Sequence, residues 1–189
     1  MTPQEFKDIQ FLTTTLVQLG RFYNTQTNSS FLTGIMKGFG WRKGYEPTEH
    51  AGTYTPSNIQ TEEDYLEWKN LILQLPKIES IIASRFKKLA PGLFLQAVEK
   101  MQKAKVPGFG DLEFNNSNST PFASNLTATW GEFSNQAHID NDVGPISYGG
   151  WCGIEEASGE PASKAGGYDI EYGQFFLPGI STVVDFNAV

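Results

Sequence analysis

A histidine and an aspartate stand two residues apart in the segment His138-Ile139-Asp140. On an extended segment, side chains two positions apart point to the same face, so an imidazole nitrogen and a carboxylate oxygen can converge on one cation. This pair supplies two of the three ligands of a 2-His-1-carboxylate facial triad, which leaves coordination positions of Fe(II) open. The alternative interpretation is a loop histidine that is hydrogen-bonded to a neighbouring aspartate.

Three further residues could take part in chemistry, and each has a plainer interpretation. Asp142 could orient His138, or it could be a solvated loop acid. His50 has no motif around it, which indicates a surface or packing role. Cys152 is predicted to be a small buried apolar residue on a strand. Four aromatic residues are expected in the core rather than as a substrate platform: Trp130, Trp151, Phe175 and Phe176.

Charge divides the 189 residues into two different halves. Residues 1–105 carry 13 of the 14 Lys and Arg residues against 10 acids, whereas residues 106–189 carry only Lys164 against 11 acids. The net charge of −7 argues against a surface built mainly to grip polyanions. A basic helix face that binds nucleic acid without catalysis remains an alternative to a solvated face for these lysines: Lys87, Lys88, Lys100, Lys103 and Lys105.

The compartment is predicted from what the chain does not contain. No apolar run approaches the length of a membrane span, and the first residues lack the features of a secretory signal. We therefore expect an intracellular protein that is neither secreted nor embedded in a membrane. With one cysteine, an internal disulfide is excluded.

Helical periodicity marks the first half of the chain. Helices are predicted over residues 3–19, 61–75 and 91–103, with another that follows Pro76 and runs to Leu89. Residues 24–60, interrupted by glycines, are expected to be irregular with short strands or turns.

After Pro107 the period changes to two, which is typical of strands. A strand is predicted over residues 122–130, and further strand candidates are residues 146–154, 168–177 and 180–186. Pro178 and Gly179 predict a turn that joins the last two as a hairpin. The fold class is therefore α+β, a single domain over 1–189 whose mainly helical part (1–106) packs on a jelly-roll sheet part (107–189).

The chain from about Gly38 to Phe186 resembles the Tet-like 2-oxoglutarate/Fe(II) oxygenase domain of basidiomycete fungi. This family is related to the ten-eleven-translocation and base-J-binding-protein oxygenases. The segments that carry the resemblance are Gly40–Glu46, Phe122–Thr127, Trp130–Phe133, His138–Asp142, Gly173–Pro178 and Val184–Phe186.

The resemblance implies a double-stranded β-helix behind a helical layer, with His138 and Asp140 as iron ligands. It implies Fe(II) as the metal, 2-oxoglutarate as cosubstrate, and a 5-methylpyrimidine in nucleic acid as the candidate substrate, and it allows a nuclear location. The pattern also leads one to expect a second iron-binding histidine and a basic residue for 2-oxoglutarate, yet no His follows His138 and no Arg follows Arg85. Lys164 lies in the Ser/Gly loop and not at the expected place.

Two expectations follow from this departure. The chain is either a dioxygenase domain cut short before its last strands, or a catalytically inactive relic or binding module that keeps the jelly-roll shell. In both cases the strand over residues 180–186 would leave an unpaired apolar edge, which predicts a marginal or self-associating polypeptide.

Overall fold

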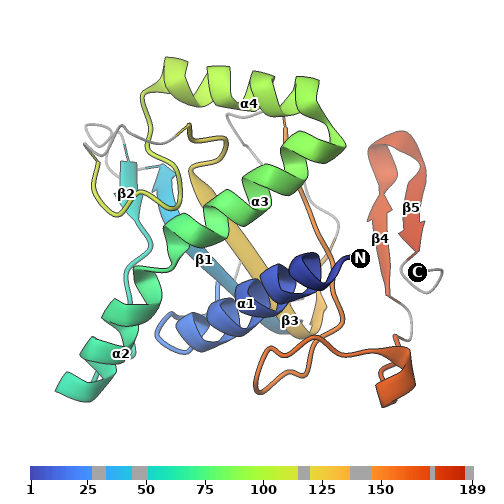
Figure 1. Ribbon diagram of the computed structural model, residues 1–189, viewed down its shortest axis with the longest axis horizontal. Coiled ribbons are helices and arrows are strands. Elements are labelled where there is room, and N and C mark those ends of the chain that lie inside the picture. The colour runs from blue at the N-terminus through green and yellow to red at the C-terminus, as the bar shows by residue number, and fades with distance from the viewer. Residues whose placement is uncertain (27–32, 44–50, 115–119, 137–145, 171–172, 186–189) are drawn as a thin grey trace.

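Helices cover one side of a small antiparallel sheet, and a two-stranded hairpin is separate from that sheet (Figure 1). The computed structural model describes residues 1–26, 33–43, 51–114, 120–136, 146–170 and 173–185. The helices are α1 (Pro3–Gly20), α2 (Glu62–Ile72), α3 (Leu75–Leu89) and α4 (Pro91–Ala104). The strands are β1 (Thr33–Lys43), β2 (Ala51–Thr53), β3 (Asn125–Ser134), β4 (Gln174–Leu177) and β5 (Thr182–Asp185). The α+β class is confirmed.

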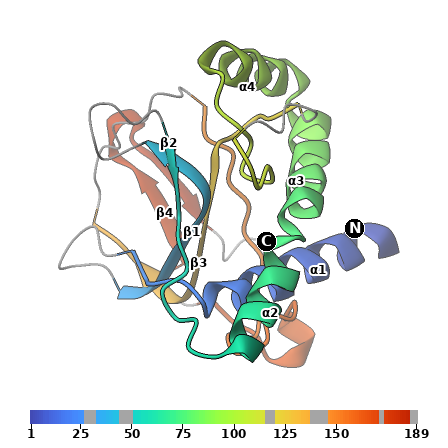
Figure 2. The ribbon, with the colours of Figure 1, turned by 90° about the vertical axis from the view of Figure 1, so that its left-hand side faces the viewer.

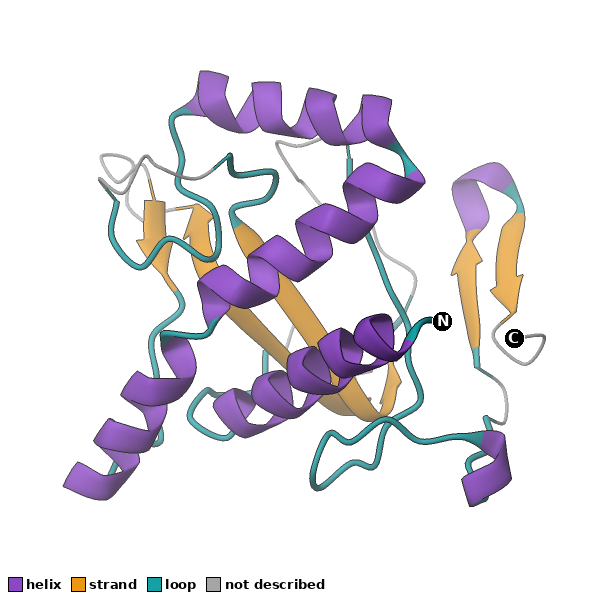
Figure 3. Ribbon diagram, viewed as in Figure 1, coloured by secondary structure: helices purple, strands orange, loops and turns teal. Residues whose placement is uncertain are grey.

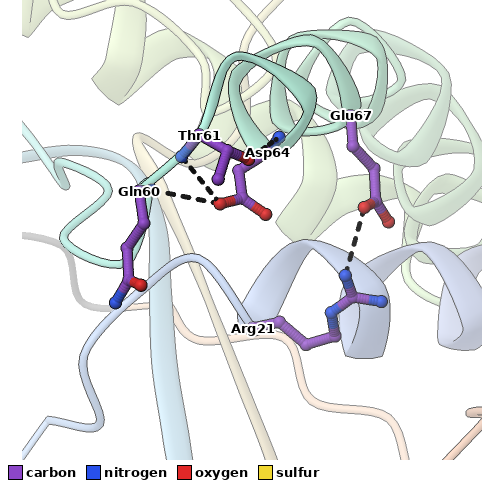
Figure 4. A network of polar contacts seen from close by, with 5 residues as sticks. All are labelled: Arg21, Gln60, Thr61, Asp64 and Glu67. Atoms are coloured by element: carbon purple, nitrogen blue, oxygen red, sulfur yellow. Dashed lines mark hydrogen bonds and ion pairs between the residues drawn. The ribbon is translucent and has the colours of Figure 1, made fainter.

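The four predicted helices are present, and local capping explains two of their starts. Thr2 and Glu5 form a capping box at the start of α1, and Thr61 and Asp64 form another at the start of α2. Pro76 and Pro91 stand in the first turns of α3 and α4, where a missing N–H costs nothing. The α2 cap lies beside an ion pair of 3.1 Å between Arg21 and Glu67, which links this helix to the end of α1 (Figure 4).

The expectation of an irregular chain over residues 24–60 is wrong for its centre, because β1 is the middle strand of the three-stranded sheet. The glycines that suggested a broken chain make room for close neighbours. A Cβ at Gly38 would lie 2.6 Å from the Tyr54 ring. A Cβ at Gly40, where φ is +87°, would lie 2.5 Å from the Cβ of Phe109. The short strand β2 does agree with the expectation.

The three strands lie side by side in the order β2-β1-β3 (Figure 3). Two of them, β1 and β2, precede the helices α2 to α4 in the chain. β3 begins and ends later than the predicted strand over residues 122–130. It pairs with β1 from Gly40 opposite Asn125 to Thr33 opposite Ser134. The sheet is therefore not confined to the second half of the chain.

The hairpin predicted around Pro178 and Gly179 is confirmed. β4 and β5 pair in an antiparallel register that sets Leu177 opposite Thr182, with a turn of 3-10 helix at Pro178–Ile180 between them. In the parts of 146–154 and 168–173 that the structure describes, the expected strands are wrong. Only an isolated bridge between Ile154 and Pro161 forms there. The two sheets have no strand in common, and their described strands do not close into a barrel.

The core lies between the helices and the sheet (Figure 2). Phe39 of β1, Ile78 of α3 and Phe109 are almost completely buried. Edge-to-face ring contacts join Phe86 of α3 to Phe94 of α4 and to Phe122, just before β3. These aromatic contacts fix the helical layer to the strand that leads toward the predicted metal ligands.

Candidate functional site

The two predicted iron ligands lie in a segment that directly follows β3. His138, Asp140 and the neighbouring Asp142 belong to residues 137–145, which lie outside the described residues, as does His50. The described residues therefore show the structure on either side of this segment.

The chain on both sides of this segment is connected to the described fold. On one side, Ser134 at the end of β3 pairs with Thr33 of β1. On the other side, Ile146 and Tyr148 pack against the buried cluster, and the Tyr148 ring stacks on Phe86 with centroids 4.7 Å apart. The fold thus fixes where the segment carrying His138 and Asp140 leaves the sheet and where it returns.

The pairing of β3 with β1 has a bulge-like irregularity near the end of β3, before this segment. Gly131 and Glu132 both have left-handed backbone conformations, with φ of +68° and +56°. The register with β1 shifts at this point, between Thr33 and Ile35. A Cβ at Gly131 would lie 2.6 Å from a carboxylate oxygen of Glu156. Bulges are common beside functional sites because they change the direction in which a strand ends.

The two faces of β3 differ in character. Leu126 and Ala128 face the helices and pack on the core, whereas Asn125, Thr127 and Thr129 alternate with them and are exposed. The face away from the helices therefore offers amide and hydroxyl groups along β3.

A buried lysine on the helix-facing side has a structural role. The Lys37 ammonium donates a hydrogen bond to the carbonyl oxygen of Tyr23, and burial lowers the pKa of Lys37. Tyr23 in turn follows α1, so this contact joins β1 to the end of the first helix. Because its ammonium group is buried and bonded to a main-chain carbonyl, Lys37 is not the basic residue that would pair with a cosubstrate.

A buried carboxylate that the sequence analysis missed lies between α3 and the loop after α4. Glu79 is 7% exposed, and its Oε2 accepts a hydrogen bond of 3.0 Å from the Gly110 amide. Burial raises the pKa of Glu79 to about 7; the nearby charge of Asp111 adds to this effect and the Gly110 bond opposes it. The signal was available in the sequence, since Glu79 stands on the apolar stripe of α3 with Leu75 and Phe86.

Several residues expected in the core are exposed instead. Cys152 is exposed and lies outside any strand, so its predicted burial on a strand is wrong. Trp151 is 59% exposed. Phe175 and Phe176 are 46% and 56% exposed, because the hairpin that carries them pairs only with itself among the described strands. Trp130 is half-buried, with its ring against Gly20 at the end of α1.

The family model of the Tet-like 2OG-Fe(II) oxygenase superfamily matches residues 2–189. The chain belongs to this superfamily. The match includes the helical layer, the sheet and the segment with His138 and Asp140. No curated protein and no solved structure shows significant similarity to the chain.

Membership of the Tet-like superfamily implies Fe(II) and 2-oxoglutarate, and the donor chemistry of the chain bears on where the metal would bind. In the described part of the chain, no three His, Cys, Asp or Glu side chains come close enough to hold a metal ion. The imidazole of His138 and the carboxylate of Asp140 are donors that suit Fe(II), but they make up only two of three protein ligands. Within the described ranges, no helix has the length and apolar character needed to cross a bilayer.

Proposed function

We propose that this superfamily member is an Fe(II)- and 2-oxoglutarate-dependent dioxygenase domain that oxidises the methyl group of a 5-methylpyrimidine in nucleic acid. The observation that carries the proposal is that the oxygenase family model covers the chain from residue 2 to residue 189 and so includes the His138-Ile139-Asp140 motif.

In this proposal His138 and Asp140 would be two of the protein ligands of the metal. A neutral imidazole nitrogen and a carboxylate oxygen each donate an electron pair to the ion, and further positions are left for the cosubstrate. Bound Fe(II) would supply the redox chemistry that couples decarboxylation of 2-oxoglutarate to succinate with hydroxylation of a substrate C–H bond. The chain's own part would be to hold these two side chains in position for the metal.

We also propose that the β1–β3 sheet is one wall of a jelly roll. The distribution of side chains supports this arrangement, since the helices cover one face and Thr127 and Thr129 line the other. In a double-layered barrel, the face away from the helices would look into the site. The apolar hairpin β4–β5 would belong to the second wall.

The experiment is an assay of the purified chain with Fe(II), 2-oxoglutarate and an oligonucleotide that contains 5-methylcytosine. We expect equal amounts of succinate and oxidised base, measured by mass spectrometry, and a loss of at least about a hundredfold in His138→Ala. The matched control is Asp169→Asn, which removes an exposed carboxylate from the same acidic half. It should retain full activity.

A non-catalytic binding module is the competing proposal, favoured by the shortage of metal ligands. The chain has two histidines, and none follows His138. If the folded protein forms no succinate with Fe(II) and 2-oxoglutarate, with or without the oligonucleotide, the enzymatic proposal is wrong and the binding module replaces it. Succinate formation without base oxidation would reject only the methylpyrimidine substrate.

A further inference from the structure

An open pocket of about 190 Å³ lies on the side of β1 that is away from β3. Its polar lining comes from three stretches of chain: the segment after α1, the end of β1, and β2 with the residues that follow it. The polar side chains that matter here are Asn24, Gln26, Arg42, Thr53, Thr55 and Ser57.

Main-chain hydrogen bonds fix the walls of this pocket to the fold. The Gln26 amide donates to the carbonyl oxygen of Met36 at 2.8 Å, which fixes one wall to β1. The Tyr54 amide donates to the carbonyl oxygen of Gly40 at 3.1 Å, and the Ser57 amide donates to that of Phe22 at 2.8 Å. These hydrogen bonds connect the segments that line the pocket to β1 and to Phe22, just after α1.

A row of hydroxyl groups forms another side of the pocket. Thr53, Thr55 and Ser57 are spaced by two and are exposed, whereas the residues between them are partly buried. This alternation sets the three hydroxyl groups on one side of the segment. They lie along the pocket that Arg42 also lines.

The chemistry of the lining selects for an oxyanion. Arg42 brings a guanidinium group, whose donors match phosphate and carboxylate oxygens. The other polar side chains are hydroxyls and amides, which can also donate, and none of the described lining residues is an acid. Donors from three separate segments of the chain favour a phosphate, which has more oxygen atoms to accept hydrogen bonds than a carboxylate.

We propose that this pocket binds a phosphate group, supplied by the backbone of a nucleic-acid strand or by a free nucleotide. The strand as source rests on the proposed function, because it would be the substrate itself. The binding of phosphate to the pocket does not rest on it, and it requires neither iron nor 2-oxoglutarate.

The experiment measures binding without metal, by NMR shifts and by titration, for three probes: inorganic phosphate, a mononucleotide and a single-stranded oligonucleotide. We expect Arg42→Gln to weaken binding by about tenfold, as loss of one charge-assisted hydrogen bond does. It should also reduce the salt slope of oligonucleotide binding by about 0.7, the value for one contact to a single strand. Thr55→Val should weaken binding by a smaller factor.

The matched control is Arg21→Gln, which removes a guanidinium that pairs with Glu67 and does not line the pocket. Loss of binding in Arg42→Gln but not in Arg21→Gln supports the proposal, and the probe that binds identifies the source of the phosphate. Equal losses in both variants would show general charge attraction and overturn it.

Two further outcomes also overturn the pocket proposal. The first is that 2-oxoglutarate or succinate shifts the pocket resonances while none of the phosphate probes does, which would make it a carboxylate site. The second is oligonucleotide binding that Arg42→Gln leaves unchanged, which would reject the pocket and leave the nucleic-acid substrate standing. Conversely, Arg42-dependent binding together with no oxidation of the oligonucleotide would support the pocket and reject the proposed function.

Discussion

Glu79 accepts a hydrogen bond from the Gly110 amide at one carboxylate oxygen, while its other oxygen, Oε1, is buried without a hydrogen-bond partner among the described residues. The contact joins α3 to the loop that carries Phe109 into the core. Protonation of Glu79 is therefore linked to the packing of the helical layer.

This contact predicts a dependence of stability on pH. The pKa of Glu79 is raised from 4.5 to about 7 in the folded protein, chiefly by burial. Because the folded state holds the proton more tightly, stability from this group falls as pH rises from about 4.5 to about 7 and stays low above that. Glu79→Gln should remove this loss, with a gain of up to about 3 kcal/mol at pH 8 and none at pH 4.

Denaturant unfolding across pH 4 to 8 measures the difference between Glu79→Gln and the parent protein. The control is Glu99→Gln, which changes an exposed glutamate on α4. A difference for Glu79→Gln that does not vary with pH would contradict the assignment of a raised pKa.

The glycines of β1 predict a steric effect. At Gly40 an added Cβ would meet the Cβ of Phe109 at 2.5 Å and the Ser124 carbonyl oxygen at 2.7 Å, at a φ that L residues rarely adopt. Gly40→Ala should lower the free energy of unfolding by about 2 to 4 kcal/mol. Gly92→Ala on α4 has open space around it and should be neutral or slightly stabilising. Thermal melts that rank the two variants the other way would count against this packing.

The cap of α2 predicts a separate, local effect. Thr61 Oγ1 accepts a hydrogen bond of 3.0 Å from the Asp64 amide, and an Asp64 carboxylate oxygen accepts one of 3.0 Å from the Thr61 amide. Thr61→Ala should cost about 1 kcal/mol of stability. Glu67→Gln, which breaks the exposed ion pair with Arg21, should cost less than about 0.5 kcal/mol. Equal costs in chemical denaturation would show that the cap contributes no more than the ion pair.

The only thiol of the chain predicts a reactivity. Cys152 is exposed, so a thiol reagent should modify it in the native protein without denaturant. Desolvation by neighbouring atoms raises its pKa, and the rate should therefore continue to rise with pH above neutrality. Modification that requires unfolding would instead agree with the buried position that the sequence suggested.

The parts of the fold that were predictable depend on local sequence. Neighbouring residues fix the starts of α1 and α2, which Thr2 and Thr61 cap, and the turn at Pro178. The sequence predicted both helix starts and the turn. The sequence did not predict β1, because Gly38 and Gly40 suggested a broken chain. These glycines leave room for Tyr54 and Phe109, which lie elsewhere in the chain. No local pattern carries that information.

The candidate functional residues also include some that local sequence indicates and some that it does not. The spacing of His138 and Asp140 suggests a metal site but also allows a loop histidine, and the family resemblance is what favours the metal site. The assignment remains a prediction because both residues lie outside the described residues. Glu79 is buried by a loop about thirty residues away, and Arg42 lines a pocket formed by three segments. Neither environment follows from local sequence, since tertiary packing creates both.

The most direct test is Mn(II) binding to the purified chain, followed by electron paramagnetic resonance as a stand-in for Fe(II). We expect one ion per chain, with affinity reduced at least tenfold in His138→Ala and in Asp140→Asn and unchanged in Asp169→Asn. Binding by His138→Ala and Asp140→Asn that equals that of the parent chain would contradict the metal site on which the account depends.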